Sequence, residues 1–184
     1  MSYELTVHVK ELNDGIIPQW LEEIRKFNMD ADIHPDFSFE RHSGFLPFRI
    51  VVYDCPNRAL NRMELLSGYE IGIQTYKHPK PVESLWSKLF DKKAEESPLE
   101  KTLKQAKHEV LFSVSAGDSF EFRLAWFSAA ALTIVCGGIL TDPQEGERMD
   151  AAKAIRCAYQ IVIDNEKEIG ENDWRTHEFK EWLS

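Results

Sequence analysis

The stretch between residues 108 and 166 constrains the fold most, because every local signal in it agrees with its neighbours. Its centre is an apolar helix with almost no polar face, which other elements must cover on most sides. Two consecutive glycines then end that helix, because glycine readily takes the left-handed conformation of a helix C-cap. The order of strand, helix, strand and helix predicts an α+β scaffold. The elements are a strand at 108–115, a helix at about 119–136, a strand at 139–142 and a helix that begins after Asp150.

The first 76 residues are rich in strand patterns, in which apolar and polar residues alternate. One amphipathic helix interrupts them, because apolar residues after Pro18 recur at intervals of three and four. Residues 41–44 are typical of a hairpin turn, where Gly44 supplies the positive φ that such loops need. The predicted elements are strands at 3–9, 33–40, 45–53 and 69–76 and a helix at 18–28.

Residues 77–107 differ from both flanks, since they hold eight lysines, three prolines and no glycine. This composition predicts a charged helical connector. A further helix is expected to begin at Pro98, because Ser97 and Glu100 have the spacing of a capping box.

The length of the chain suits one domain, and no internal repeat divides it. We therefore predict an α+β fold with a mostly antiparallel sheet and helices packed on one face. The expected domain is 1–184, with a strand-rich half at 1–76, the connector at 77–107 and a second half at 108–184 that ends in a short helix at 174–182.

Composition and charge exclude several classes of function. The net charge is −9 and the acids gather toward the two ends, so phosphate backbones repel the chain and nucleic acid is excluded as a partner. No stretch stays apolar over the ~18 residues that a membrane span needs. The three cysteines form no CxxC pair, and the N-terminus lacks a basic start and an apolar signal core. We therefore expect a cytoplasmic protein without a disulfide framework.

The most metal-like residues are two histidines and two acids on the strand expected at 33–40 and just beyond it. They are His34, Asp36, Glu40 and His42, and the hypothesis they raise is a divalent-metal or acid–base site. Strand geometry opposes it, because a rise of ~3.3 Å per residue separates His34 from His42 by about 26 Å. The alternative interpretation is the solvated face of an amphipathic strand, and we expect no metal and no cofactor.

A second candidate for chemistry is Ser119. The run Gly117-Asp118-Ser119 follows an apolar strand and resembles the nucleophile block of GDSL-type hydrolases, and Asp173 and His177 resemble that family's downstream pair. The family places its Asp and His three residues apart rather than four, and its Gly-Asp-Ser near the N-terminus. A helix cap explains Asp118 and Glu121 fully, so the match to a catalytic site is incomplete.

Three stretches together resemble small bacterial cytoplasmic proteins, some of which are immunity proteins encoded beside toxins. They are His42–Phe48, Ser67–Ile73 and Gly138–Gly146. The resemblance implies a compact α+β fold and a binding role, and it transfers no functional residue to this chain.

The hypothesis that best fits these observations is a non-catalytic cytoplasmic binding protein, of the kind that an immunity protein against a basic toxin represents. Its partner is expected to be a basic protein, because acidic groups speed the association of oppositely charged surfaces. The predicted contact residues are Asp30, Asp32, Asp36 and Glu40. The alternative is a small hydrolase or metal-dependent enzyme that uses Ser119 or the face formed by His34, Asp36, Glu40 and His42. The oligomeric state does not follow from the sequence.

Overall fold

A computed structural model describes residues 3–78, 96–115 and 117–182. Its centre is an eight-stranded antiparallel sheet in the order β2-β3-β4-β5-β1-β6-β7, and β8 pairs with β4 outside this path. The predicted fold class is thereby confirmed. The strands are β1 Tyr3–Val9, β2 Met29–Ile33, β3 Gly44–Val52, β4 Glu64–Thr75, β5 His108–Val114, β6 Ile139–Asp142, β7 Glu147–Met149 and β8 His177–Glu178.

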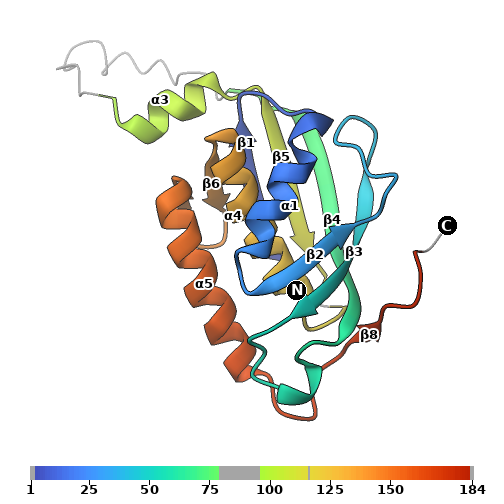
Figure 1. Ribbon diagram of the computed structural model, residues 1–184. Coiled ribbons are helices and arrows are strands. Elements are labelled where there is room, and N and C mark those ends of the chain that lie inside the picture. The colour runs from blue at the N-terminus through green and yellow to red at the C-terminus, as the bar shows by residue number, and fades with distance from the viewer. Residues whose placement is uncertain (1–2, 79–95, 116, 183–184) are drawn as a thin grey trace.

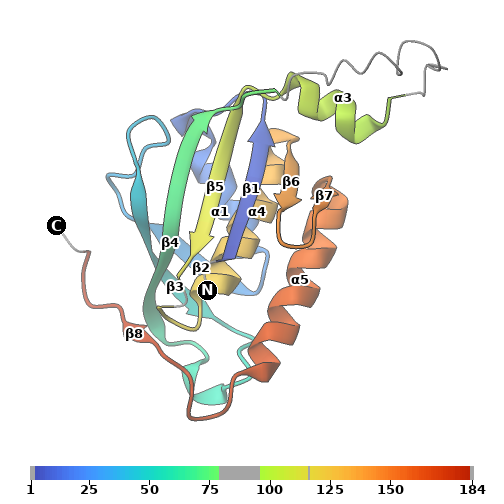
Figure 2. The same cartoon turned by 180° about the vertical axis from the view of Figure 1, so that it is seen from behind.

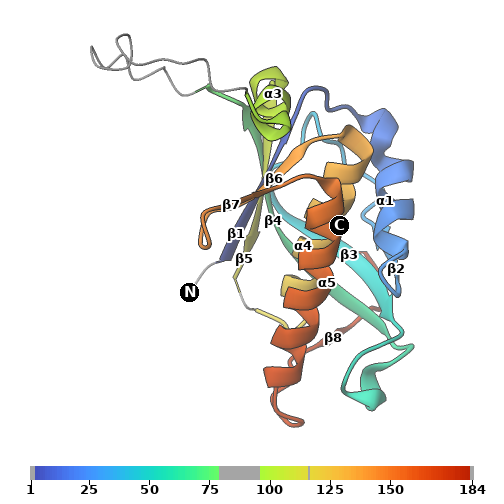
Figure 3. The same cartoon turned by 90° about the vertical axis from the view of Figure 1, so that its left-hand side faces the viewer.

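Helices cover one face of the sheet, as Figures 1 and 3 show. The long helices α4 and α5 lie beside each other, and α1 packs against α4 above the β2 side of the sheet. The helix α3 lies at the end of the sheet near β1 and β6. The helices are α1 Ile17–Arg25, α3 Pro98–Gln105, α4 Glu121–Cys136 and α5 Ala151–Glu168, with 3₁₀ turns η1 Asp14–Ile16 and η2 Arg58–Leu60.

The core lies between this helical layer and the inner face of the sheet. The side chains of α4 are buried from Leu124 to Thr133, as its apolar sequence predicts. Trp126 and Trp20 are both fully buried, and the indole N–H of Trp20 donates to the backbone oxygen of Ser128 at 2.8 Å. Gly137 ends the helix with a φ of 58°, which confirms the predicted C-cap.

Several predicted elements lie where the sequence places them. The strands at 3–9, 108–115 and 139–142 are confirmed, and so is the Asp150 cap, whose carboxylate accepts the N–H of Lys153. The capping box of Ser97 and Glu100 is also present. A short strand, β7, comes between β6 and α5. Most of the predicted connector, residues 79–95, lies outside the described residues.

The strand predicted at 33–40 is wrong. The strand β2 ends at Ile33, and residues 34–43 form a loop before β3. Phe37, Ser38 and Phe39 are all buried in succession, so the segment lacks the alternating exposure that the prediction of a half-buried strand assumed. The alternating aromatics therefore anchor a loop, and Gly44 has the expected positive φ of 99° at the end of a ten-residue connection.

The short helix predicted at 174–182 is also wrong. This segment is extended and runs along the side of the sheet, where β8 pairs with Leu65 and Leu66 of β4 (Figures 1 and 2). The strand β4 is twelve residues long, and β5 pairs with only one half of it. The other half leaves backbone groups exposed along the same edge, and β8 satisfies part of them.

The start of α4 differs in detail from the prediction. Phe120 is the N-cap residue, and the carboxylate of Asp118 accepts the N–H of Phe120 at 2.7 Å. Glu121 accepts the N–H of Ser115 at 3.0 Å rather than that of Asp118, so the cap that was predicted to join Asp118 and Glu121 is wrong. Glu121 instead ties the start of α4 to the end of β5.

Candidate functional site

No helix of the described chain covers the outer face of the sheet (Figures 2 and 3). Directly paired residues of antiparallel strands point to the same face, so the register defines three rows across β4, β5 and β1. We call these nine residues the open-face patch. The rows are Glu70, Ser113 and Glu4; then Gly72, Leu111 and Thr6; then Gln74, Glu109 and His8.

The open-face patch carries three carboxylates and no balancing cation. Glu4 and Glu70 are exposed and Glu109 is partly exposed, and among the described residues no Lys or Arg lies within ion-pair distance of any of them. Burial lowers the pKa of His8, so its 3.8 Å approach to Glu109 is not an ion pair at neutral pH. Arg148 on β7 continues the middle row outside these nine residues, because Thr141 pairs with both Thr6 and Arg148, and its charge helps to lower the pKa of His8. The patch therefore has a charge of about −3 at neutral pH.

The middle row of the patch carries no charge. Gly72 has no side chain, and a Cβ built there meets only Leu111, at 3.7 Å. Phe45 continues the first row on β3 and is 46% exposed, with its ring lying against Gly68. Carboxylates around a low apolar centre suit a partner that brings both an apolar contact and positive charge.

Two of the predicted contact residues lie on the same face but at its edge, on β2. Asp32 accepts from both Arg25 and Arg49, at 2.8 and 2.7 Å, and Arg49 also bonds Glu64. The hydroxyl of Tyr53 donates to Asp30. The charge of Asp32 is therefore already neutralised within the protein, unlike the charges of Glu4 and Glu70.

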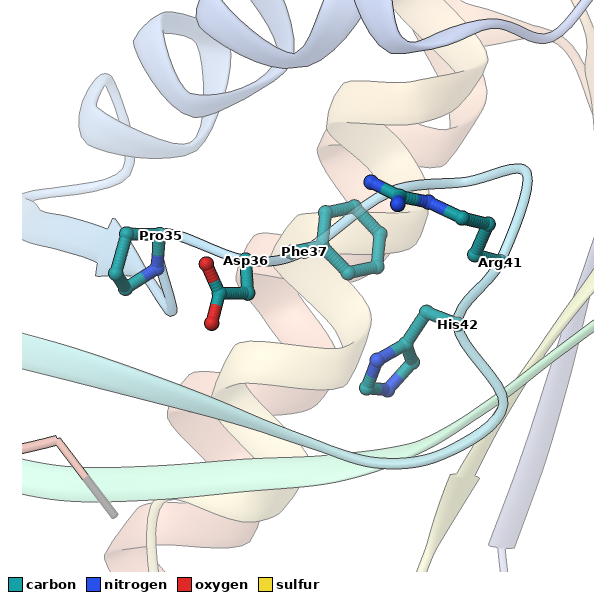
Figure 4. Close-up of a pocket in the computed structure, with 5 residues that line it drawn as sticks. All are labelled: Pro35, Asp36, Phe37, Arg41 and His42. Carbon is teal, nitrogen blue, oxygen red and sulfur yellow. The ribbon is translucent and has the colours of Figure 1, made fainter. Parts of the chain in front are cut away.

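The other two predicted contact residues, Asp36 and Glu40, lie in the 34–43 loop and are exposed. Asp36 lines a hollow of about 420 Å³ together with Pro35, Phe37, Arg41 and His42 (Figure 4). The prediction that a strand keeps the two ends of the segment at 34–42 far apart is therefore wrong, because the loop brings residue 42 back beside residue 36.

The predicted metal-like cluster is only partly assembled. Asp36 and His42 line the hollow of the loop, whereas His34 packs edge-on against Trp182, with ring centroids 5.4 Å apart. Within residues 3–78, 96–115 and 117–182, no three His, Cys, Asp or Glu side chains are placed to hold one metal ion. The four residues named from the sequence thus do not converge on a common point.

Ser119 is held by the C-terminal segment. Its Oγ accepts the N–H of Arg175 at 2.9 Å, and its own N–H donates to the oxygen of Arg175 at 2.8 Å. No hydrogen bond joins Ser119 to a histidine in the described part of the chain. These contacts give Ser119 a role in fastening the extended segment to the start of α4.

Asp118, next to Ser119, is a buried carboxylate. Both its oxygens lie within hydrogen-bond distance of the Ser67 hydroxyl, at 3.1 and 3.0 Å. Burial raises the pKa of Asp118 to about 6, against the opposing hydrogen bonds from Phe120 and Ser67. Perturbed carboxyls often mark functional sites. Here the contacts of Asp118 are with structural groups of the fold, and Ser119 is tied to the backbone.

The structure contains a buried ion pair that no pattern in the sequence predicts. Arg123 on α4 donates to both oxygens of Glu166 on α5, at 2.6 and 2.7 Å, and both side chains are 2% exposed. Arg123 also donates to Asp54 at 2.8 Å. The bidentate geometry satisfies both charges, so this pair aligns the two helices rather than forming a reactive centre.

No helix in the described part of the chain has the length and apolarity that crossing a membrane requires. No protein-family model, curated protein or solved structure matches this chain. The case for a function therefore depends on the geometry of its own residues.

Proposed function

We propose that this chain is a non-catalytic binding protein that docks a basic protein on its open-face patch, as an immunity-type inhibitor of a basic toxin would. The observation that carries the proposal is the set of three uncompensated carboxylates, Glu4, Glu70 and Glu109, on a sheet face that no described helix covers. The patch differs in position from the residues that the sequence favours, which lie on β2 and in the 34–43 loop.

Electrostatics favours the patch over the β2 edge as the centre of contact. A carboxylate that already bonds two arginines, as Asp32 does, offers little further attraction to a cation. Unpaired carboxylates raise the local concentration of a basic partner and speed its association. Salt screens such attraction over about 8 Å at physiological ionic strength, so the association is expected to weaken as salt rises.

A site-specific cross-linker tests the location of this surface. A photoreactive amino acid is placed at Ser113, in the centre of the patch, and in a second variant at Ala152, which is exposed on α5 on the helical side. In a low-salt lysate of the source cells, the Ser113 variant is expected to cross-link to a basic protein. The Ala152 variant is expected not to capture that protein.

Charge variants test the cause of the binding. Replacing Glu4, Glu70 and Glu109 by Gln should weaken binding of the captured protein at least about tenfold, because it removes three attractive charges. The matched control replaces three exposed acids elsewhere, Glu11, Glu22 and Glu171, by Gln and changes the net charge equally. Equal losses in both triple variants, or equal cross-linking from positions 113 and 152, would reject the patch as the docking surface.

A further inference from the structure

The hollow in the 34–43 loop has the properties of a preformed small-molecule site. Its base is packed into the core: Phe37 and Phe39 are buried and lie against Trp20, with ring centroids 6.0 and 5.2 Å away. Asp14 clamps the same stretch, because its carboxylate accepts the hydroxyl of Ser38 and the N–H of Phe39, both at 2.7 Å. The loop therefore needs little ordering when a ligand binds, which favours affinity.

The charged side chains around this hollow form no ion pairs with other described parts of the protein. In the described part of the chain, no acid forms an ion pair with Arg41 and no cation forms one with Asp36. The Nε2 atom of His42 is buried and has no hydrogen-bond partner among the described residues. Within the described residues, the charges of Arg41 and Asp36 are therefore available to a ligand in the hollow.

The positively and negatively charged side chains lie at opposite ends of the hollow. Arg41 and His42 lie at one end of the hollow and Asp36 at the other, with the Phe37 ring between them (Figure 4). The His42 imidazole contacts Phe37 edge-on, with ring centroids 5.3 Å apart, which fixes its orientation. A guanidinium with an imidazole N–H matches a carboxylate, and a carboxylate matches an ammonium group.

We propose that the loop hollow binds a small zwitterion of the amino-acid class, with its carboxylate on Arg41 and His42 and its ammonium on Asp36. The volume of about 420 Å³ suits a molecule of this size. A dianion such as phosphate fits less well, because Asp36 repels it. A metal ion fits less well too, because Arg41 shares the hollow with the two candidate ligands.

Titration of the intact protein with a panel of probes tests this site. The zwitterionic probes are glycine, β-alanine, γ-aminobutyrate and phenylalanine, which differ in the distance between their two charged groups and in the size of their apolar part. Acetate and inorganic phosphate serve as anionic probes. Backbone amide shifts of residues 34–44 in NMR spectra report binding at the hollow. At least one zwitterion is expected to bind there in the millimolar range or tighter, and more tightly than acetate or phosphate.

Two variants test the two charged ends of the hollow separately. Asp36→Asn should weaken binding of the zwitterion about tenfold, because it removes the partner of the ammonium group. Binding of acetate should stay unchanged or become tighter, because the same substitution removes a repulsive charge. Arg41→Gln should weaken both, and the exposed control Arg156→Gln should change neither. Three results would each overturn the proposal. The first is acetate binding as tightly as every zwitterion, and the second is the absence of any shift with any probe at about 50 mM, roughly an upper bound for a useful site. The third is an identical titration of Arg41→Gln and the unmodified protein.

Discussion

Single residues in this protein show how burial decides the role of a charge. Arg123 and Glu166 are buried as a bidentate pair, so each charge is satisfied by the other. Asp118 is buried without a cationic partner, and only neutral groups donate to it. Glu70 is exposed and carries no partner in the described chain. The buried pair aligns two helices, the buried Asp118 carries an energetic cost at neutral pH, and the exposed Glu70 is available for binding.

The pKa of Asp118, raised by burial to about 6, predicts how its substitution changes stability with pH. The folded protein holds this proton between about pH 4 and 6, whereas the unfolded chain has released it, so stability from this group is lost as pH rises through that window. Above pH 6 the charged form costs up to about 3 kcal/mol, at ~1.4 kcal/mol per pKa unit. Asp118→Asn keeps an acceptor for Phe120 and removes the charge.

Denaturant unfolding of Asp118→Asn and the unmodified protein at pH 4, 5, 6 and 7 measures this effect. The variant should gain on the unmodified protein by about 2–3 kcal/mol between pH 4 and 7. Other titrating groups cancel in the difference between the two proteins. A difference that stays constant over this range would contradict an elevated pKa of Asp118.

At the scale of elements, the sequence predicts best where one signal has one structural meaning. The apolar run of α4 and the glycine after it, Gly137, allow only a buried helix with a C-cap. The alternation of Phe37 and Phe39 has two meanings, because aromatic anchors of a buried loop can have the same spacing as one face of a strand. The segment at 174–182 also misleads, since its extended form depends on pairing with β4, which is more than a hundred residues away in the chain.

Two glycines of β4 provide a matched test of how closely β3 and β4 approach. A Cβ at Gly68 would lie 2.4 Å from the oxygen of Leu46 and 2.5 Å from the ring of Phe45, so the backbone would have to shift. A Cβ at Gly72 would meet its nearest neighbour at 3.7 Å, an ordinary contact. Gly68→Ala should therefore destabilise the fold by about 1–3 kcal/mol, whereas Gly72→Ala should be neutral or stabilise it by up to about 1 kcal/mol.

Thermal or urea unfolding of the two variants checks this contrast. Both substitutions lower the entropy of the unfolded chain equally, so the difference between them reports the native state alone. Equal stabilities would mean that β3 and β4 do not approach as closely as the register places them.

At the scale of the whole molecule, the candidate site was less predictable than the fold. An acidic surface for a basic partner follows from the uneven charge, but its place depends on which strands become neighbours. Glu4, Glu70 and Glu109 come from three distant parts of the sequence, and only the pairing of β1, β4 and β5 joins them. The alternation in each strand shows that these acids face solvent, and it leaves open which carboxylates share a patch.

The same interleaving of strands predicts that the protein unfolds as one cooperative unit. The strand β5 of the second half pairs with β1 and β4 of the first, and α4 covers the inner sheet face that both halves form. Fragments 1–78 and 96–184 should each be largely unfolded alone, because each leaves its part of the core uncovered. Mixed together, they should regain the circular dichroism spectrum of the intact chain, with a concentration-dependent melting temperature. A cooperative thermal transition in either isolated fragment would show that the two halves are separate domains.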